Sequence, residues 1–304
     1  MFKFNVDDLI QSGLVTSKES PCGRYRLMKY HSKVFYNNLW DTDHRLLQCR
    51  GIVVDRDDNV IMYPFDKIFN YGENGTGYDL NPRAVYRKVE KRNGFLAQAA
   101  MVEGELLVTS SGSFTSEHRD LAYHWITTTM YNALGTDLSY LPAGFTFMFE
   151  ICDPTDPHIV AEESGAYLIG ARETSHGRSE VVPEITLDQM ASHFGFLRPA
   201  HELVTLEEAI RQSRFVKHEG FILRDLRMEK PVLKLKSKHY LSKKAMMRMG
   251  KKVADSMFNN PEYFRERLDE EFYDIHKFLI KTYTVEEWIS FTEKQRRSII
   301  EGYF

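Results

Sequence analysis

The hydrophobic pattern of this 304-residue chain changes once, near Leu241, and this change constrains the fold more than any other feature. Before that point, short runs rich in β-branched and aromatic residues alternate with turn residues, which is typical of strands. We expect such strands at 49–55, 60–63, 94–100, 106–110, 145–151, 167–171, 220–224 and 232–236. We therefore predict an α+β fold, with an antiparallel-sheet domain over residues 1–241 and a small all-helical domain over 242–304.

Three short patterns predict where individual helices begin. Thr205-Leu206-Glu207-Glu208 is a capping box, which indicates a helix continuing to about Ser213. Asn260-Pro261-Glu262 places proline in a first helical turn, and Thr284-Val285-Glu286-Glu287 is a second capping box. The run Val102-Glu103-Gly104-Glu105 predicts the turn of a hairpin between two of the expected strands.

Cysteine content and hydropathy exclude several classes of protein. No stretch approaches the roughly 20 apolar residues of a membrane-spanning helix, so we expect no membrane association. The first residues lack a secretory signal pattern. Cys22, Cys49 and Cys152 show no paired spacing, which favours free thiols over a disulfide framework or a zinc site. We therefore expect a cytoplasmic protein.

Charge is distributed unevenly along the chain. The net charge is −3, yet residues 211–252 hold 14 Lys and Arg against 3 Asp and Glu. A charge run alone is more often a solvated helix face. Here apolar residues alternate with the basic ones, so we expect a track for a polyanion.

Lys91 begins the run Lys91-Arg92-Asn93-Gly94, just before an apolar strand. Lys-x-x-Gly arises easily by chance, and Lys217-His218-Glu219-Gly220 is a second example. Taken alone, Lys91 would be an ordinary surface lysine. A lysine with an ordinary pKa of about 10.4 becomes a nucleophile only if desolvation or nearby positive charge lowers that pKa.

Lys234 and Lys236 are two residues apart in an expected strand, so both point to one face while Leu233 and Leu235 point to the other. Their positive charges are candidates for lowering the pKa of Lys91. The alternative is an alternating, half-exposed strand with no special role.

Two carboxylates stand at the edges of apolar runs, Glu150 after Phe145-Thr146-Phe147-Met148-Phe149 and Glu219 before Gly220-Phe221-Ile222-Leu223. Carboxylates are rarely buried without a partner. An ion pair at a strand end would suffice. The pair could instead hold Mg²⁺ directly or through its waters, with Mn²⁺ as the alternative ion.

Arg50, in an expected strand, and Lys67, in Pro64-Phe65-Asp66-Lys67-Ile68-Phe69-Asn70, are candidates for binding a triphosphate. Arginine grips phosphate with two parallel hydrogen bonds, and lysine acts as a point charge. Singly, each would be an ordinary surface or ion-paired residue.

The order of these motifs resembles that of the covalent nucleotidyltransferases, and most closely the ATP-dependent RNA ligases of the bacteriophage RNA ligase 1 type. The resemblance spans about residues 45–245. It is carried by Cys49-Arg50-Gly51-Ile52, the element from Pro64 to Glu73, Lys91-Arg92-Asn93-Gly94, Glu150, Glu219-Gly220, and Lys234-Leu235-Lys236 with Tyr240. It implies an antiparallel-sheet, ATP-grasp-like nucleotidyltransferase domain. Motif order favours Lys91 over Lys217, which lies too close to Lys234 for a Glu150-like strand to intervene.

The sequence departs from the family pattern at two places. The family usually has two acidic residues where Arg92 and Asn93 stand, and it often has a lysine at the position of Ser111. A metal contact at Arg92-Asn93 would have to be made differently here. One phosphate or ribose contact is absent at Ser111 or supplied from elsewhere.

The resemblance implies three nucleotidyl transfers. Lys91 attacks ATP to form lysyl-AMP, AMP passes to an RNA 5′-phosphate, and an RNA 3′-hydroxyl displaces AMP. It implies that Lys91, Lys234 and Lys236 are catalytic and that Glu150 and Glu219 place Mg²⁺. It further implies an ATP-binding set made of Arg50, Lys67, Lys91, Glu150, Glu219, Lys234, Lys236 and Tyr240.

The substrate expected from this resemblance is RNA with 5′-phosphate and 3′-hydroxyl ends, with broken transfer RNA as a candidate and RNA repair as the role. A monomer is expected, located in the host cytoplasm if the chain is encoded by a phage. Three alternatives stay open: a DNA ligase, a GTP-using capping-type enzyme, and a non-catalytic RNA-binding relative. Both alternative enzymes normally add an oligonucleotide-binding barrel, whereas the tail here is expected to be helical.

Overall fold

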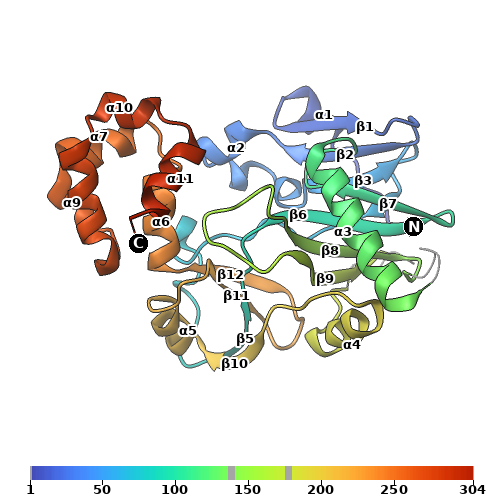
Figure 1. Ribbon diagram of the computed structural model, residues 1–304. Helices are drawn as coiled ribbons and strands as arrows, with labels where there is room; N and C mark the ends of the chain where they lie inside the picture. The colour runs from blue at the N-terminus through green and yellow to red at the C-terminus, as the bar shows by residue number, and fades with distance from the viewer. Residues whose placement is uncertain (1, 136–140, 175–179, 304) are drawn as a thin grey trace.

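The computed structural model describes residues 2–135, 141–174 and 180–303, and its strands form three four-stranded antiparallel sheets (Figure 1). The first has the order β1-β2-β3-β4, the second β10-β5-β11-β12 and the third β7-β6-β8-β9. The strands are β1 (Val15–Glu19), β2 (Tyr25–Tyr30), β3 (Arg50–Asp55), β4 (Val60–Met62), β5 (Val85–Glu90), β6 (Phe95–Val102), β7 (Glu105–Ser110), β8 (Phe145–Cys152), β9 (Gly165–Glu173), β10 (His201–Thr205), β11 (Gly220–Arg224) and β12 (Pro231–Lys236).

Helices cover the sheets and form the C-terminal part of the chain. The α-helices are α1 (Asp7–Gln11), α2 (Ser32–Tyr36), α3 (Glu117–Leu134), α4 (Glu184–Phe194), α5 (Leu206–Ser213), α6 (Lys238–Met247), α7 (Lys251–Asn259), α8 (Pro261–Arg265), α9 (Tyr273–Thr282), α10 (Val285–Ser290) and α11 (Glu293–Glu301). Short 3₁₀ turns lie at Trp40–Thr42, His44–Leu47, Glu73–Gly75 and Glu270–Phe272. Among the described residues, no helix is both long enough and apolar enough to span a membrane.

The second sheet (β10-β5-β11-β12) and the third sheet (β7-β6-β8-β9) are joined by residues 91–94, through which the chain passes directly from β5 to β6. The sheet β6-β7-β8-β9 packs its apolar face against α3 and α4 in a cluster that includes Phe147, Phe149 and Ile126. The other sheet packs against α5 through residues such as Leu233 and Leu235. Residues 91–94 therefore lie where two independently packed sheets meet.

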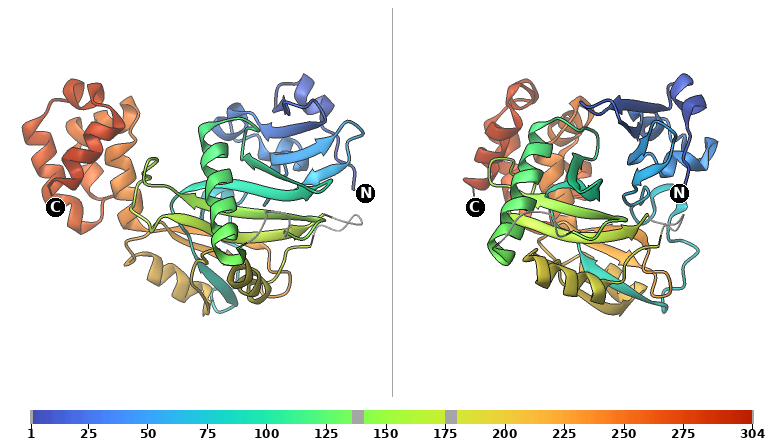
Figure 2. Two further views of the ribbon diagram at one scale, coloured as in Figure 1. Left: turned by 45° about the vertical axis from the view of Figure 1, so that its right-hand side comes forward. Right: turned by 90° about the vertical axis from the view of Figure 1, so that its right-hand side faces the viewer.

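The C-terminal helices form their own apolar cluster around Trp288, Leu279 and Ile275. Figure 2 shows these helices as a group to one side of the sheets. Ile159 and Val160, from the segment between β8 and β9, are buried in this cluster. The helical group is therefore anchored to the sheets by a loop as well as by the chain that continues from β12 into α6.

The α+β prediction is confirmed, and the expected strands correspond to β3, β4, β6, β7, β8, β9, β11 and β12. The expected hairpin turn is also present: Val102 pairs with Glu105, and both Glu103 (φ 53°) and Gly104 (φ 83°) have positive φ, as a two-residue hairpin loop requires. The expected helix starts are present at Thr205, Pro261 and Thr284.

Several elements were not predicted, chiefly β1, β2, β5, β10, α3 and α4. In β1 the charged residues Lys18 and Glu19 weaken the alternation, and in β5 Arg87 and Lys88 do the same. The change from strands to helices occurs at Ser237, the residue that caps α6, so Leu241 lies inside a helix. The division of the chain into domains at 241 stays a prediction.

Candidate active site

Lys91 lies between two carboxylates that come from different sheets. Its Nζ donates a hydrogen bond to Glu219 at 2.9 Å and lies 3.8 Å from Glu150 Oε1. Glu150 is on β8, and Glu219 immediately precedes β11. The two carboxylates predicted as a pair are therefore brought together, with the predicted nucleophile between them.

Two glycines allow this close approach. A Cβ at Gly94 would lie 2.2 Å from the carbonyl oxygen of Ile151, so no other residue fits there without a shift of the backbone. The Gly94 N–H donates to Glu150 at 3.1 Å. Gly220 has φ +127°, and its carbonyl accepts a hydrogen bond from the Lys91 N–H at 2.8 Å. The glycines of both Lys-x-x-Gly runs thus hold the main chain around Lys91.

The pKa of Lys91 is raised, which corrects the expectation that Lys234 and Lys236 would lower it. Burial lowers the pKa of this amine, but the carboxylates of Glu150 and Glu219 outweigh burial. The Nζ of Lys236 lies against one of these two carboxylates as well, 3.1 Å from Glu219. In the free protein, Lys91 is therefore an ammonium ion held by two carboxylates.

The residues at the first departure from the family pattern are both engaged. Arg92 pairs with Glu162 at 2.9 Å and with Glu90 at 3.3 Å. The Asn93 amide donates to Glu219 at 2.8 Å and accepts from the Val160 N–H at 2.9 Å. Asn93 therefore orients the carboxylate that binds Lys91, a role that the sequence did not reveal.

Lys234 and Lys236 lie on one face of β12, and Leu233 and Leu235 are buried on the other, as predicted. Their environments differ. Lys236 has a carboxylate partner, whereas no ion pair joins Lys234 to a carboxylate among the described residues. Burial lowers the pKa of Lys234 to about 7, with further contributions from Lys67 and Arg50.

Arg50, Lys67 and Lys234 form a group that we call the cation cluster. Burial lowers the pKa of Arg50, and no carboxylate pairs with it among the residues described. Lys67 has a distant partner, Glu73, at 3.6 Å, and burial lowers its pKa as well. Because these cations influence one another's pKa without a matching set of carboxylates, the cluster is suited to an anion.

Lys29 is a further cation beside this cluster that sequence reasoning missed. It pairs across β2 and β3 with Arg50, and burial, followed by the charge of Arg50, lowers its pKa. Its Nζ lies 3.1 Å from where a Cβ on Gly112 would be. Gly112 follows Ser111, so Lys29 reaches the place where the family pattern has a lysine. The signal was hidden because β2 was not predicted.

Tyr240 packs against Lys236, the second lysine of β12. It is buried among the C-terminal helices, and the Lys236 Nζ lies 4.7 Å from its ring centroid. Burial, and then the charge of Glu219, raises the pKa of its hydroxyl to about 12. Tyr240 is therefore neutral and packs beneath the ammonium group of Lys236.

An apolar slot opens beside Lys91 between the two sheets. One wall is formed by Val89 and Ile222, and the other by Leu96 and Ile169. Lys91, Glu150, Arg50 and Lys234 also line this pocket. The pocket therefore combines apolar side chains with the Lys91 amine and two members of the cation cluster, which suits a nucleotide.

Other charged groups that the sequence offered do not join the site. Lys217 is largely exposed and pairs with Glu271 at 3.1 Å, which agrees with the choice of Lys91. Glu184, Asp188 and His201 lie close enough to hold a metal ion. Glu184 and Asp188 are instead paired with Arg198, and Glu184 also with Arg224. This cluster therefore already has its counter-ions.

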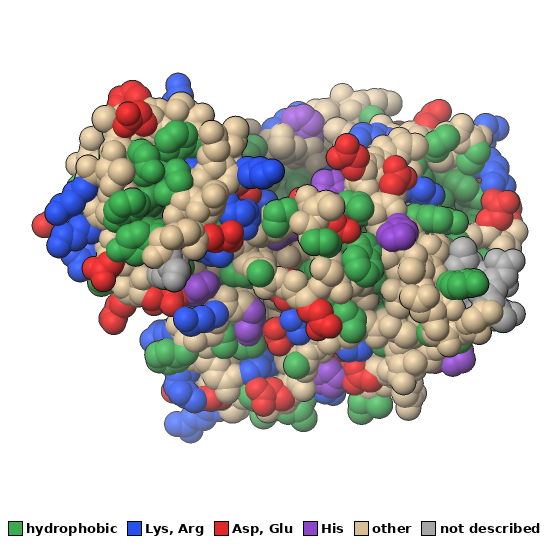
Figure 3. Space-filling model, viewed as in Figure 1, with side chains coloured by type: hydrophobic (Ala, Val, Ile, Leu, Met, Phe, Trp, Pro, Cys, Tyr) green, Lys and Arg blue, Asp and Glu red, His purple; other side chains and the backbone are tan. Residues whose placement is uncertain are grey.

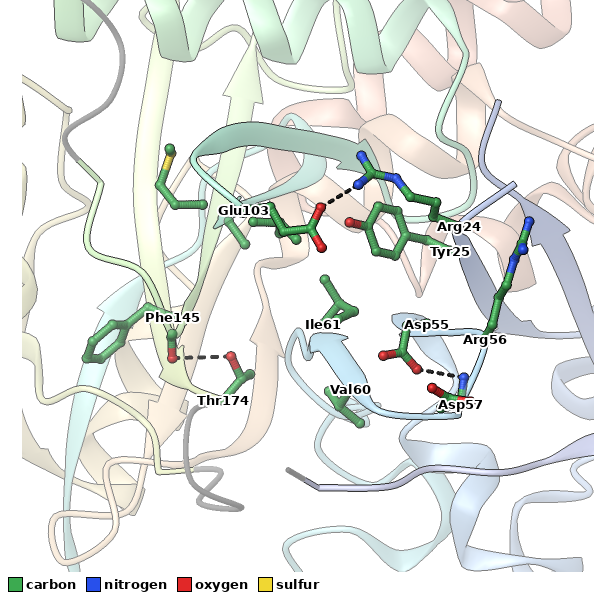
Figure 4. Close-up of a pocket in the computed structure, with 14 residues that line it drawn as sticks. Arg24, Tyr25, Asp55, Arg56, Asp57, Val60, Ile61, Glu103, Phe145 and Thr174 are labelled. Carbon is green, nitrogen blue, oxygen red and sulfur yellow. Dashed lines mark hydrogen bonds and ion pairs between the residues drawn. The ribbon is translucent and has the colours of Figure 1, made fainter. Parts of the chain in front are cut away.

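A second hollow, between the sheet β1-β2-β3-β4 and the sheet β6-β7-β8-β9, contains none of the predicted site residues (Figure 4). Arg24 and Glu103 face each other across it as an ion pair. Asp55 accepts hydrogen bonds from the N–H groups of Asp57 and Asn59. Arg24, Glu103 and Asp55 thus have partners within this hollow.

Comparison with known proteins identifies similar sequences and folds. Residues 48–273 match the family described as RNA ligase. Two structures of an archaeal ATP-dependent RNA ligase, form 1 and form 2, align with TM-scores of 0.57 and 0.55 at 16% and 15% identity. Both alignments cover 97% of this chain, with 78% of the first and 75% of the second. A proposed ATP-dependent DNA ligase from Aquifex aeolicus aligns with a TM-score of 0.54 at 14% identity, over 98% of this chain and 77% of that one. At such identities the structural likeness shows a shared fold.

Proposed function

The chain belongs to the RNA ligase family and is therefore an enzyme, and from this premise we propose that it uses ATP and a divalent metal ion to form lysyl-AMP on Lys91. The observation that carries this proposal is the position of the Lys91 amine. It lies between Glu150 and Glu219 and lines the same apolar slot as Arg50 and Lys234. A nucleotide in the slot would bring an anion to cations that have no carboxylate partner.

The reaction proceeds in three chemical steps, each of which forms and breaks one bond to phosphorus. The neutral Lys91 amine attacks the α-phosphorus of ATP, an N–P bond forms, the bond to pyrophosphate breaks, and the amine proton leaves. An RNA 5′-phosphate oxygen then attacks the same phosphorus and breaks the N–P bond, and Lys91 regains a proton. Finally, an RNA 3′-hydroxyl attacks the activated 5′-phosphate and AMP leaves. Alignment and neutralisation of phosphoryl charge dominate all three.

The cations bind different phosphates of ATP according to their positions. Lys236 and Lys234 stabilise the α-phosphate, and Arg50 and Lys67 bind the outer phosphates. Lys29, beside Arg50, supplies the contact that Ser111 cannot make. Tyr240 holds Lys236 in place through its ring. A lysine with a pKa of about 7 gains its proton readily when a phosphate approaches, because the phosphate favours the charged form.

Glu150 and Glu219 are the residues that would hold the metal ion, with a role for Glu150 at the ribose as the alternative. Carboxylate oxygens suit Mg²⁺ and Mn²⁺, and both side chains are buried and face a positive charge in the free protein. When bound, such an ion would neutralise phosphate charge and offset the negative charge of the two carboxylates beside Lys91, which would favour the neutral amine.

We further propose RNA with 5′-phosphate and 3′-hydroxyl ends as substrate, a broken transfer RNA as the physiological candidate, and RNA repair in the cytoplasm as the role of a monomer. The basic stretch 211–252 would follow the RNA backbone, so binding should weaken as salt rises. The family match does not favour the DNA ligase, capping-enzyme or non-catalytic alternatives.

The test is labelling of the protein with α-labelled ATP or GTP and Mg²⁺, followed by denaturation. We expect protein-bound label from ATP that is released when RNA carrying a 5′-phosphate is added, and then joined RNA. Label from GTP alone would support the capping alternative. Joining of DNA ends in preference to RNA ends would contradict the choice of substrate, and the absence of label from either nucleotide would contradict the proposed chemistry.

A further inference from the structure

Two pairs of exposed aromatic side chains flank the cation cluster. Phe35 and Tyr36, at the end of α2, pack edge to face at 5.5 Å, and Tyr71 and Tyr78 pack edge to face at 5.9 Å. Their exposed fractions are 51% and 79% for the first pair and 39% and 71% for the second. Single exposed aromatic residues are common, but two pairs beside a cluster of cations call for an explanation.

Each pair contacts a different member of the cation cluster. The Lys67 Nζ lies 5.9 Å from the ring centroid of Phe35. The Tyr71 N–H donates to the carbonyl oxygen of Lys234 at 2.8 Å, next to a β-bridge between Asn70 and Lys234. Lys67 in turn contributes to the lowered pKa of Lys234. Both aromatic pairs are therefore neighbours of the cation cluster.

The loop from Tyr71 to Tyr78 has the glycines needed to hold its two rings together. Gly72 and Gly77 have φ of +80° and +87°, which residues with a side chain rarely adopt. A Cβ at Gly77 would lie 2.8 Å from the Tyr71 ring, and one at Gly72 would lie 3.0 Å from the Tyr78 hydroxyl. Glu73 fixes the start of the loop by accepting a hydrogen bond from the Asn70 N–H at 2.9 Å. The loop thus presents the tyrosine rings while leaving them largely exposed.

We propose that Phe35–Tyr36 and Tyr71–Tyr78 form a stacking platform for nucleobases of single-stranded RNA beside the ends to be joined. This inference rests on the proposed function. Charge complementarity favours RNA over an apolar partner, because a strand lying on these rings would bring its phosphates toward Arg50 and Lys67, which pyrophosphate leaves after the first step. Figure 3 shows Lys and Arg side chains gathered near the hollowed junction between the C-terminal helices and the sheets. Stacking on aromatic rings accepts any base, so the platform would bind RNA ends with little sequence preference.

The test uses Tyr36→Ala and Tyr78→Ala, because these two side chains are the most exposed of the four and their removal should leave folding intact. Each variant is assayed for lysyl-AMP formation without RNA, and then for joining of single-stranded RNA under single-turnover conditions. We expect lysyl-AMP formation to stay within about twofold of the parent protein. The RNA concentration for half-maximal rate should rise about 5- to 150-fold, as the loss of one stacked base implies.

Controls separate stacking from other effects. Tyr36→Phe and Tyr78→Phe should retain RNA affinity, and Tyr131→Ala, which removes a 61% exposed ring on α3, should change nothing. An RNA with abasic nucleotides next to its ends should bind the parent protein as weakly as intact RNA binds the alanine variants. The alanine variants should lose little more with that RNA, since the same contact would be removed twice.

Three outcomes would overturn the platform. One is unchanged joining in both alanine variants, and another is equal loss in the phenylalanine variants. The third is a raised KM for ATP in lysyl-AMP formation, which would mean that the rings bind the base of ATP. If the parent protein formed no lysyl-AMP at all, the proposed chemistry would fail. Direct binding of the same RNA to the parent and alanine proteins, measured by fluorescence anisotropy, would still decide about the platform.

Discussion

The two ends of the candidate site differ in whether their lysine has a carboxylate partner and in the direction of its pKa shift. At one end, Lys91 has two carboxylates within 3.8 Å, and its pKa is raised. At the other, Lys234 is partly buried near Lys67 and Arg50 with no ion pair to a carboxylate among the described residues, and its pKa is lowered to about 7. The difference shows which end of the site already has its counter-ion in the free protein. The carboxylate end has its cation, whereas the cation cluster lacks an anion that a ligand must supply.

The largest effect should come from removing the amine at the carboxylate end. Lys91→Ala should abolish protein-bound label from α-labelled ATP, because it removes the amine that lies between Glu150 and Glu219. Lys217→Ala is the matched control, since Lys217 begins the other Lys-x-x-Gly run and is exposed. Retention of label in Lys91→Ala together with its loss in Lys217→Ala would reverse the assignment.

The next largest effect should come from the cation cluster. Lys234→Ala should slow lysyl-AMP formation by about 10²- to 10³-fold, the usual result of removing one group that stabilises developing charge. Lys234→Arg should retain much more activity, because it keeps the charge. If alanine and arginine at this position gave equal rates, the role of Lys234 would not be electrostatic. The rate constant is measured in single-turnover labelling.

The pKa of Lys234 predicts how nucleotide affinity depends on pH. Above pH 7 the free protein holds Lys234 neutral, so an incoming triphosphate must bind together with a proton. The dissociation constant of α,β-methylene-ATP, which cannot release pyrophosphate, should therefore rise between pH 7 and 9 by at most about tenfold per pH unit. Lys234→Arg should flatten this dependence. A parent protein whose affinity does not change over this range would contradict a neutral Lys234.

A smaller effect is expected at the edge of the cluster. Lys29→Ala should raise the KM for ATP roughly fivefold, the effect of losing about 1 kcal/mol from one charged contact. Ser111→Lys in the same chain should restore affinity, because it places an amine where the family pattern has one. A normal KM in Lys29→Ala would remove Lys29 from the site. A raised KM that Ser111→Lys does not restore would mean that Lys29 does not take the place of the family's lysine.

The smallest effect should be on stability. The pKa of Lys234 is lower in the folded protein than in the unfolded chain, so the free energy of unfolding is highest above the unfolded pKa and decreases as pH falls toward 7. This decrease is the cost of protonating a partly buried lysine. Lys234→Met removes that cost and should raise the free energy of unfolding by about 1 kcal/mol at pH 7. The gain should shrink at pH 9.5. Urea unfolding at both values checks the sign, and a loss of stability at pH 7 would contradict it.

The sequence predicted features that depend on local period and missed those that depend on long-range pairing. The shared face of Lys234 and Lys236 follows from the alternation of a strand, and the structure agrees. The predicted sign of the Lys91 pKa shift was wrong, because no local pattern shows that Glu150 and Glu219 would both lie against Lys91. Lys29 escaped notice for the same reason, since its relation to Arg50 exists only across paired strands.

The roles of the site residues also separate into those that local sequence predicts and those that depend on long-range contacts. Glu150 was singled out by its apolar surroundings, and it does lie beside Lys91. Asn93 was treated only as a departure from a pattern. Its hydrogen bonds to Glu219 and Val160 join residues more than 60 positions apart, which no reading of the local sequence could supply.

The hydrogen bond between Asn93 and Val160 has a practical consequence for anyone shortening this protein. Val160 is buried among the C-terminal helices, and Asn93 holds the carboxylate that binds Lys91. A chain ending at Leu241 would expose Ile159 and Val160 to water and release that support. Shortened proteins should therefore lose lysine labelling even when no RNA is present, and a biochemist who needs an isolated catalytic half must first redesign the loop at 159–160.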